Sequence, residues 1–68
     1  MNKSEAFRNL LQSQELLDEV EAMKKELTDL IINSDDDESS VREAAYVRIR
    51  TINELMARFE SIAKDDEI

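Results

Sequence analysis

The chain has 68 residues, of which 41% are hydrophobic, and its seventeen acidic and nine basic residues give a net charge of −8. This charge repels phosphate backbones and argues against general nucleic-acid binding. The sequence contains no Gly, Pro, Cys, Trp or His, which removes the usual residues of tight turns, disulfides and zinc sites. We therefore expect an all-α protein.

The small size of the chain makes association with another chain the expected source of stability. Domains below roughly 70–80 residues seldom bury enough apolar surface alone, and they commonly rely on a disulfide, a metal or a partner. Because Cys and His are absent, we expect a partner chain, and specifically a homodimer. No apolar run approaches the ~20 residues of a membrane span, and the N-terminus lacks the apolar region of a signal peptide. These features predict a soluble, cytoplasmic protein that does not bind membranes.

The first predicted helix covers about residues 3–32, with Asn2 as its N-cap and Ser4 as a competing cap. In its second half, apolar residues recur at steps of three and four, which brings them onto one face of a helix. The resulting seam contains Leu16, Val20, Met23 and Leu27. Ser13 and Gln14 interrupt this seam at its beginning. We expect one of them either to form a polar layer that selects a register or to lie at the edge of the seam.

The stretch 33–40 reads Asn-Ser-Asp-Asp-Asp-Glu-Ser-Ser and is predicted to be an acidic turn. Asn, Asp and Ser compete for backbone hydrogen bonds, and consecutive carboxylates oppose the dipole at a helix C-terminus. Ser40 and Glu43 have the spacing of a capping box. We therefore expect a second helix over about residues 41–64.

The second helix carries one apolar stripe that is suited to a buried face. Its central members, which we expect in the dimer seam, are Ile49, Ile52, Met56 and Phe59. Tyr46 lies at the margin of the stripe, and Val47 points away from it. Residues 65–68 are expected to form a frayed acidic tail.

The distribution of charge favours pairing of the first helix with the second. Residues 1–33 carry a net charge of −3, residues 34–40 carry −4 and residues 41–64 carry +2. The predicted fold is an all-α, two-helix antiparallel hairpin that forms one domain and dimerises into a four-helix bundle. The alternative is one continuous helix in an antiparallel coiled coil, and the composition of the turn argues against it.

The sequence predicts neither an enzyme nor a cofactor or metal site. Without His or Cys, no recognisable spacing joins a nucleophile to a base, and no glycine-rich loop is present to hold a phosphate. An EF-hand loop that began at Asp35 would place Ser40 at its glycine position and Tyr46 at its bidentate glutamate position. The acidic stretch therefore does not match a calcium loop.

Two similar helical arms and a predicted dimer resemble the Rop family of plasmid copy-number regulators, which are four-helix-bundle dimers that bind paired RNA loops. The resemblance lies in the architecture, and no aligned motif covers the chain. It implies an alternative function in which the arginines of the second helix bind RNA. These residues are Arg42, Arg48, Arg50 and Arg58. Glutamates are interleaved with them, so surface ion pairs are the competing explanation.

The segment from Ser13 to Asp18, Ser-Gln-Glu-Leu-Leu-Asp, resembles the Ser-Gln-Glu-Leu-Asp signature of the sporulation aspartyl-phosphate phosphatases. Those proteins are small helical hairpins that act on a response regulator. The resemblance covers six of the 68 residues. The additional Leu17 rotates Asp18 by about 100° around a helix, and the motif lies on the first helix rather than the second. The resemblance therefore implies no functional residue in this chain.

The predicted function is that of a small regulatory protein that self-associates and binds another protein. Its exposed apolar residues would anchor the partner, and its acidic turn would steer the encounter. The residues predicted to bind the partner are Tyr46, Val47, Asp35, Asp36, Asp37 and Glu38. A further alternative is an acidic mimic of nucleic acid that blocks a DNA-binding protein.

Overall fold

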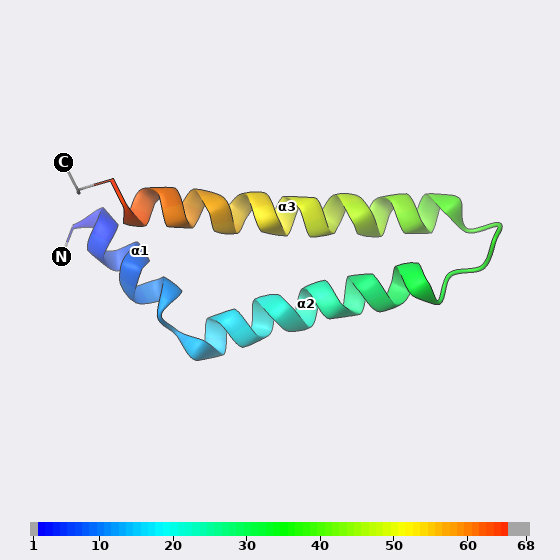
Figure 1. The fold of residues 1–68 in the computed structure, drawn as a ribbon, viewed down its shortest axis with the longest axis horizontal. Helices are drawn as coiled ribbons and strands as arrows, with labels where there is room; N and C mark the ends of the chain where they lie inside the picture. The colour runs from blue at the N-terminus through cyan, green and yellow to red at the C-terminus, as the bar shows by residue number, and fades with distance from the viewer. Residues whose placement is uncertain (1, 66–68) are drawn as a thin grey trace.

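The computed structural model describes residues 2–65, which form three α-helices and no β-strand. The helices are α1 (Lys3–Leu11), α2 (Gln14–Ile32) and α3 (Ser39–Ala63). α2 and α3 run antiparallel and are joined by a turn, whereas α1 lies at the other end, beside the last turns of α3 (Figure 1). The all-α class is therefore confirmed, with three helices in place of the two that we expected.

The two long helices, α2 and α3, lie side by side (Figure 1). The molecule is elongated, with principal dimensions of 50 × 22 × 12 Å. The α2–α3 pair has a hollow along each of its two sides. No helix within residues 2–65 combines the length and the apolar character that are needed to cross a bilayer.

The prediction of one helix over residues 3–32 is wrong, because the chain bends at Gln12 and Ser13. Ser13 is extended, with φ −74° and ψ 112°, and its side chain accepts a hydrogen bond from the backbone N–H of Leu16. It is the N-cap of α2 rather than a polar layer in a seam. Gln14 points outward, and its Nε2 donates to Asp18 Oδ1 at 2.8 Å. The interruption in the apolar pattern is therefore a helix boundary.

The bend at Ser13 allows α1 to pack against the C-terminal part of α3. The rings of Phe7 and Phe59 lie 5.1 Å apart between centroids. Arg8 Nη1 donates to the backbone carbonyl of Ala63 at 2.7 Å, and a cation at a helix C-terminus is favoured by the helix dipole. At this end the start of α2 lies farther from α3, and α1 lies beside the end of α3 (Figure 1). A straight continuation of α2 would leave Phe59 without this aromatic contact.

The caps of the other helices partly follow the predictions. Asn2 caps α1, because its Oδ1 accepts from the backbone N–H of Glu5 at 2.8 Å. The expected cap at Ser40 is wrong, since α3 begins at Ser39 and its N-cap residue, Glu38, makes no side-chain cap hydrogen bond. α3 ends at Ala63, close to the predicted end. Most of the predicted tail, residues 66–68, lies outside the described residues.

The interior is small and made of small residues. Within residues 2–65 only Ala45, Ala63 and Ser4 are buried, and no large side chain is fully enclosed. Seven of the eight predicted seam residues are half-buried at the helix contacts of one chain, whereas Met23 is exposed. A pair of helices covers each large apolar side chain from one direction only, so burial stays incomplete.

Candidate protein-interaction face

The contact between α2 and α3 has two different sides. Successive residues of a helix are separated by about 100° around its axis, so two neighbouring residues at the contact can lie on either side of it. Met23 and Ile52 lie on one side, and Lys24 and Asn53 lie on the other. Met23 and Ile52 line one hollow along the molecule, while Lys24 and Asn53 line another. We call these two sides the open face and the clasped face.

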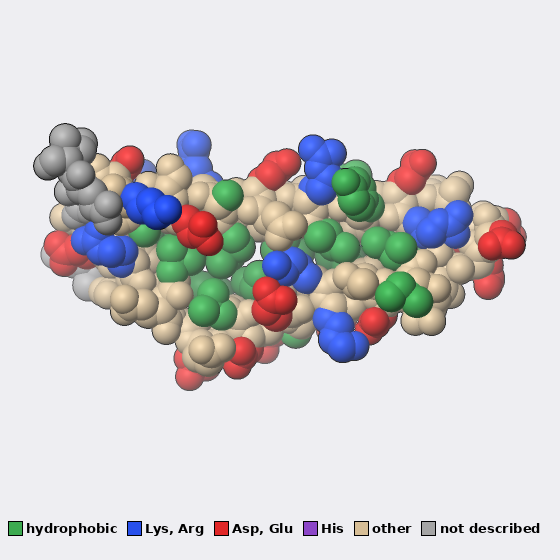
Figure 2. Space-filling model, in the orientation of Figure 1, with side chains coloured by type: hydrophobic (Ala, Val, Ile, Leu, Met, Phe, Trp, Pro, Cys, Tyr) green, Lys and Arg blue, Asp and Glu red, His purple; other side chains and the backbone are tan. Residues whose placement is uncertain are grey.

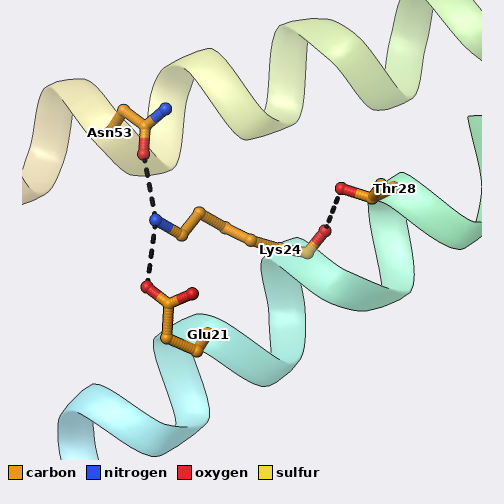
Figure 3. Close-up of polar contacts among 4 residues, drawn as sticks. All are labelled: Glu21, Lys24, Thr28 and Asn53. Carbon is orange, nitrogen blue, oxygen red and sulfur yellow. Dashed lines mark hydrogen bonds and ion pairs between the residues drawn. The ribbon is translucent and has the colours of Figure 1, made fainter.

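The clasped face is bridged by a polar cluster that joins the helices (Figure 3). Lys24 Nζ donates to Asn53 Oδ1 at 3.3 Å and lies 3.2 Å from Glu21 Oε1. The Lys24 side chain is only 28% exposed, because its aliphatic part covers the apolar contact beneath. Figure 2 shows apolar side chains between α2 and α3 that are interrupted near the middle by a basic and an acidic side chain. These polar groups satisfy one another and cover this side.

The open face has no such bridge. It is a hollow of about 590 Å³ lined by Met23, Leu27, Leu30 and Ile52, with Glu26, Arg48 and Thr51 around them. Leu55 follows Arg48 by seven residues and therefore lies on the same side of α3. Met23 is 51% exposed, Leu30 is 44% exposed and Leu55 is 52% exposed. This face presents a continuous apolar strip from both long helices to solvent.

The acidic turn is held in place by Arg42 from the first turns of α3. Its Nη1 donates to Ser34 Oγ at 3.1 Å and to the Asp35 carbonyl at 2.6 Å. Its Nη2 lies 3.5 Å from the Asp36 carbonyl. The Glu38 carboxylate accepts from the backbone N–H of Asp35 at 2.7 Å. Of the carboxylates predicted to bind a partner, Glu38 is therefore used within the turn, while those of Asp35, Asp36 and Asp37 remain exposed.

The two apolar residues predicted to bind a partner lie near this turn. Tyr46 and Val47 are 57% and 56% exposed, and they line a shallow hollow with Ile31. Ile32, at the end of α2, is 71% exposed. The structure thus brings exposed apolar groups to the same end of the molecule as the acidic turn, a region that we call the turn end. Acidic side chains gather at this end in Figure 2.

Several residues of these surfaces were missed by the sequence analysis. The Lys24–Asn53 bridge depends on the register of two helices, and the apolar spacing alone does not determine that register. Arg42 donates mainly to backbone carbonyls. Because every residue has a backbone carbonyl, the sequence of the turn does not identify these acceptors. The exposure of Leu30 and Leu55 could have been predicted from the sequence, because helical spacing places both beside the central seam.

Other charged groups are engaged on the outer surface of the helices. Arg50 lies 3.9 Å from Glu54. The hydrogen bond from Lys25 Nζ to Asp29 Oδ2, at 2.9 Å, raises the pKa of Lys25. Within residues 2–65 no three carboxylates converge in a group that could hold a metal ion.

Comparison with known proteins finds no matching family model, no similar curated protein and no similar solved structure.

Proposed function

We propose that this chain is a non-enzymatic interaction protein that self-associates through its open face and binds another protein at its turn end. One observation carries the proposal: the open face exposes a strip of large apolar side chains, while no large side chain among residues 2–65 is fully enclosed. Large contiguous apolar patches on a protein surface are typical of interaction sites. An elongated strip along two antiparallel helices has the shape that accepts further helices.

The free energy available at this face favours association. Burying a large apolar side chain contributes ~1.5–3 kcal/mol. Since Met23, Leu30 and Leu55 are about half exposed, each would gain about 1 kcal/mol on covering. In a symmetric dimer every such contribution occurs twice. The clasped face offers less, because a partner there would have to bury or break the polar bridge at Lys24.

The turn end supports the second part of the proposal. Tyr46 and Val47 supply apolar contact area, and Asp35, Asp36 and Asp37 supply a negative potential that accelerates encounter with a basic partner. Arg42 holds the backbone of the turn by the hydrogen bonds described above. A turn that is already ordered loses less conformational entropy on binding.

Two substitutions on α3 provide a matched test of self-association. Leu55 and Val47 are nearly equally exposed, but only Leu55 lies on the open face. We expect Leu55→Gln to weaken self-association at least tenfold, which corresponds to ~1.4 kcal/mol, and Val47→Gln to leave it unchanged. Sedimentation equilibrium over a range of concentrations measures both. A wild-type mass of 7.9 kDa at every concentration, or equal effects of the two substitutions, would contradict the proposal.

The same variants test binding at the turn end. A protein retained by the wild type on a pull-down column should be retained by Leu55→Gln and lost with Val47→Gln. The opposite pattern would assign the bound protein to the open face.

A further inference from the structure

We infer that the open face binds a second copy of this chain with the two acidic turns at the same end of the dimer. The inference rests on the proposed self-association and adds its geometry. It follows from the charges that flank the apolar strip and from the register of α2 against α3.

The two edges of the open face carry opposite charges. On α2, Glu26 lines the hollow, and Glu19 precedes it by seven residues, which places both on one side of the helix. On α3, Arg48 lines the hollow, and Arg58 follows the lining residue Thr51 by the same interval. All four charged side chains are exposed. Among the described contacts of the chain, none of the four makes a hydrogen bond or an ion pair.

Glu26 and Arg48 line the same hollow, so their side chains lie at similar heights along the molecule. In antiparallel helices, moving seven residues back along α2, from Glu26 to Glu19, corresponds to moving about seven residues forward along α3, from Arg48 to Leu55. Glu19 therefore lies within about one helical turn of Arg58.

Two symmetric ways exist to place one open face on another. If the two-fold axis runs parallel to the helices, α2 of one copy lies on α3 of its partner, and heights are preserved. Glu19 then faces the region of Arg58 in the other copy, and Glu26 faces the region of Arg48. If the axis runs across the helices, α2 lies on α2 and acidic edge meets acidic edge. Opposite charges attract and like charges repel across an interface, so the first arrangement is favoured.

The favoured arrangement brings the two acidic turns to the same end. Their exposed carboxylates repel, but charges in solvent that are farther apart than the Debye length, about 8 Å at physiological salt, are largely screened. The dimer would then display Tyr46, Val47 and the acidic turn twice at one end. Two copies of one binding surface would raise the avidity for a partner that offers two basic sites.

A single spin label distinguishes the arrangements. The chain has no Cys, so Asp37→Cys introduces one thiol in the exposed part of the turn. For labelled full-length protein, double electron–electron resonance should give a separation of about 20 Å, or two helix diameters. A separation near the 50 Å length of the molecule would overturn the inference and leave self-association intact. The absence of dipolar coupling in a protein that sediments as a monomer would overturn both.

Charge reversal gives an independent test with opposite signs for the two arrangements. With turns at the same end, Glu26→Arg should raise the dissociation constant roughly fivefold, which is within the range of exposed ion pairs that occur twice. The double variant Glu26→Arg with Arg48→Glu should restore it. Glu43→Arg, an equal change of charge near the turn end, is the control and should have a smaller effect. If Glu26→Arg instead tightens the dimer, the acidic edges face each other and the inference is wrong.

Discussion

The open and clasped faces are built from the same two helices, yet one is covered and the other is not. On the clasped face, Lys24 reaches across to Asn53 and lays its aliphatic part over the seam. On the open face, the equivalent positions one residue earlier are Met23 and Ile52, which have no polar group to bridge the helices. The difference shows that a small polar cluster, Glu21 and Lys24 with Asn53, can bridge one side of a helix pair and cover its apolar contact. Two substitutions test which face drives assembly, and two smaller ones test contacts outside these faces.

The largest effect is expected when the open face receives its own polar bridge. Met23→Lys combined with Leu55→Asn should abolish dimerisation at all accessible concentrations, because two half-exposed apolar anchors are replaced in each copy and a charge would have to be buried. Sedimentation velocity measures the change, and circular dichroism should show that helix content is retained. A double variant that still dimerises would exclude the open face as the interface.

Removing the polar bridge from the clasped face should create a second apolar face that can self-associate. Lys24→Leu with Asn53→Leu removes the bridge and extends the apolar surface over both sides, so we expect assemblies larger than a dimer in light scattering. Lys25→Leu is the control, because it removes one charge and adds an apolar side chain at the neighbouring position while it leaves Lys24 and Asn53 in place. Equal aggregation of the two variants would show that charge loss, rather than the bridge, limits assembly.

A smaller effect is expected at the bend between α1 and α2. Ser13→Ala removes the hydroxyl that accepts from the N–H of Leu16 and should lower the free energy of unfolding by about 1 kcal/mol. Urea denaturation followed by circular dichroism measures the loss. Gln12→Ala, one position earlier, lacks this capping role and should change stability by less. Equal losses would mean that Ser13 does not act as the cap.

The smallest effect concerns the exposed pair of Lys25 and Asp29. Asp29 raises the pKa of Lys25 above its ordinary value of 10.5, so the contribution of this pair to stability is present below that pH and is lost as the pH rises through the raised pKa. Thermal melting of wild type and Asp29→Asn at pH 8 and pH 12 should show a slight difference at the lower pH that vanishes at the higher one. A difference that persists at pH 12 would have another origin.

The sequence predicted the parts of the fold that depend on neighbouring residues. The absence of Gly and Pro and the spacing from Leu16 onward predicted helices, and Asn2 was identified as a cap. The bend was missed because a serine in an apolar pattern fits a polar layer as well as a cap. The distant contacts of α1 with α3, those of Phe7 with Phe59 and of Arg8 with Ala63, favour the bend and therefore the cap.

The candidate site was less predictable for a related reason. Tyr46 was singled out because it lies at the margin of the stripe of α3, and Val47 because it points away from that stripe; both are exposed. The distinction between open and clasped faces depends on which residues of α2 and α3 lie at equal height. Apolar spacing determines the face of each helix separately and leaves their relative height undetermined. The hollow that Glu26 and Arg48 line together supplies that height.

The packing of α1 against α3 also has a consequence for the order in which the protein can fold during synthesis. α1 leaves the ribosome before α2 and α3, but its contacts are with a later segment: Ala63 follows Arg8 by 55 residues. A nine-residue helix is too short to be stable in water by itself. We therefore expect α1 to remain largely unstructured while α2 and α3 pair. It can pack in its final place only after the last turn of α3 has been synthesised.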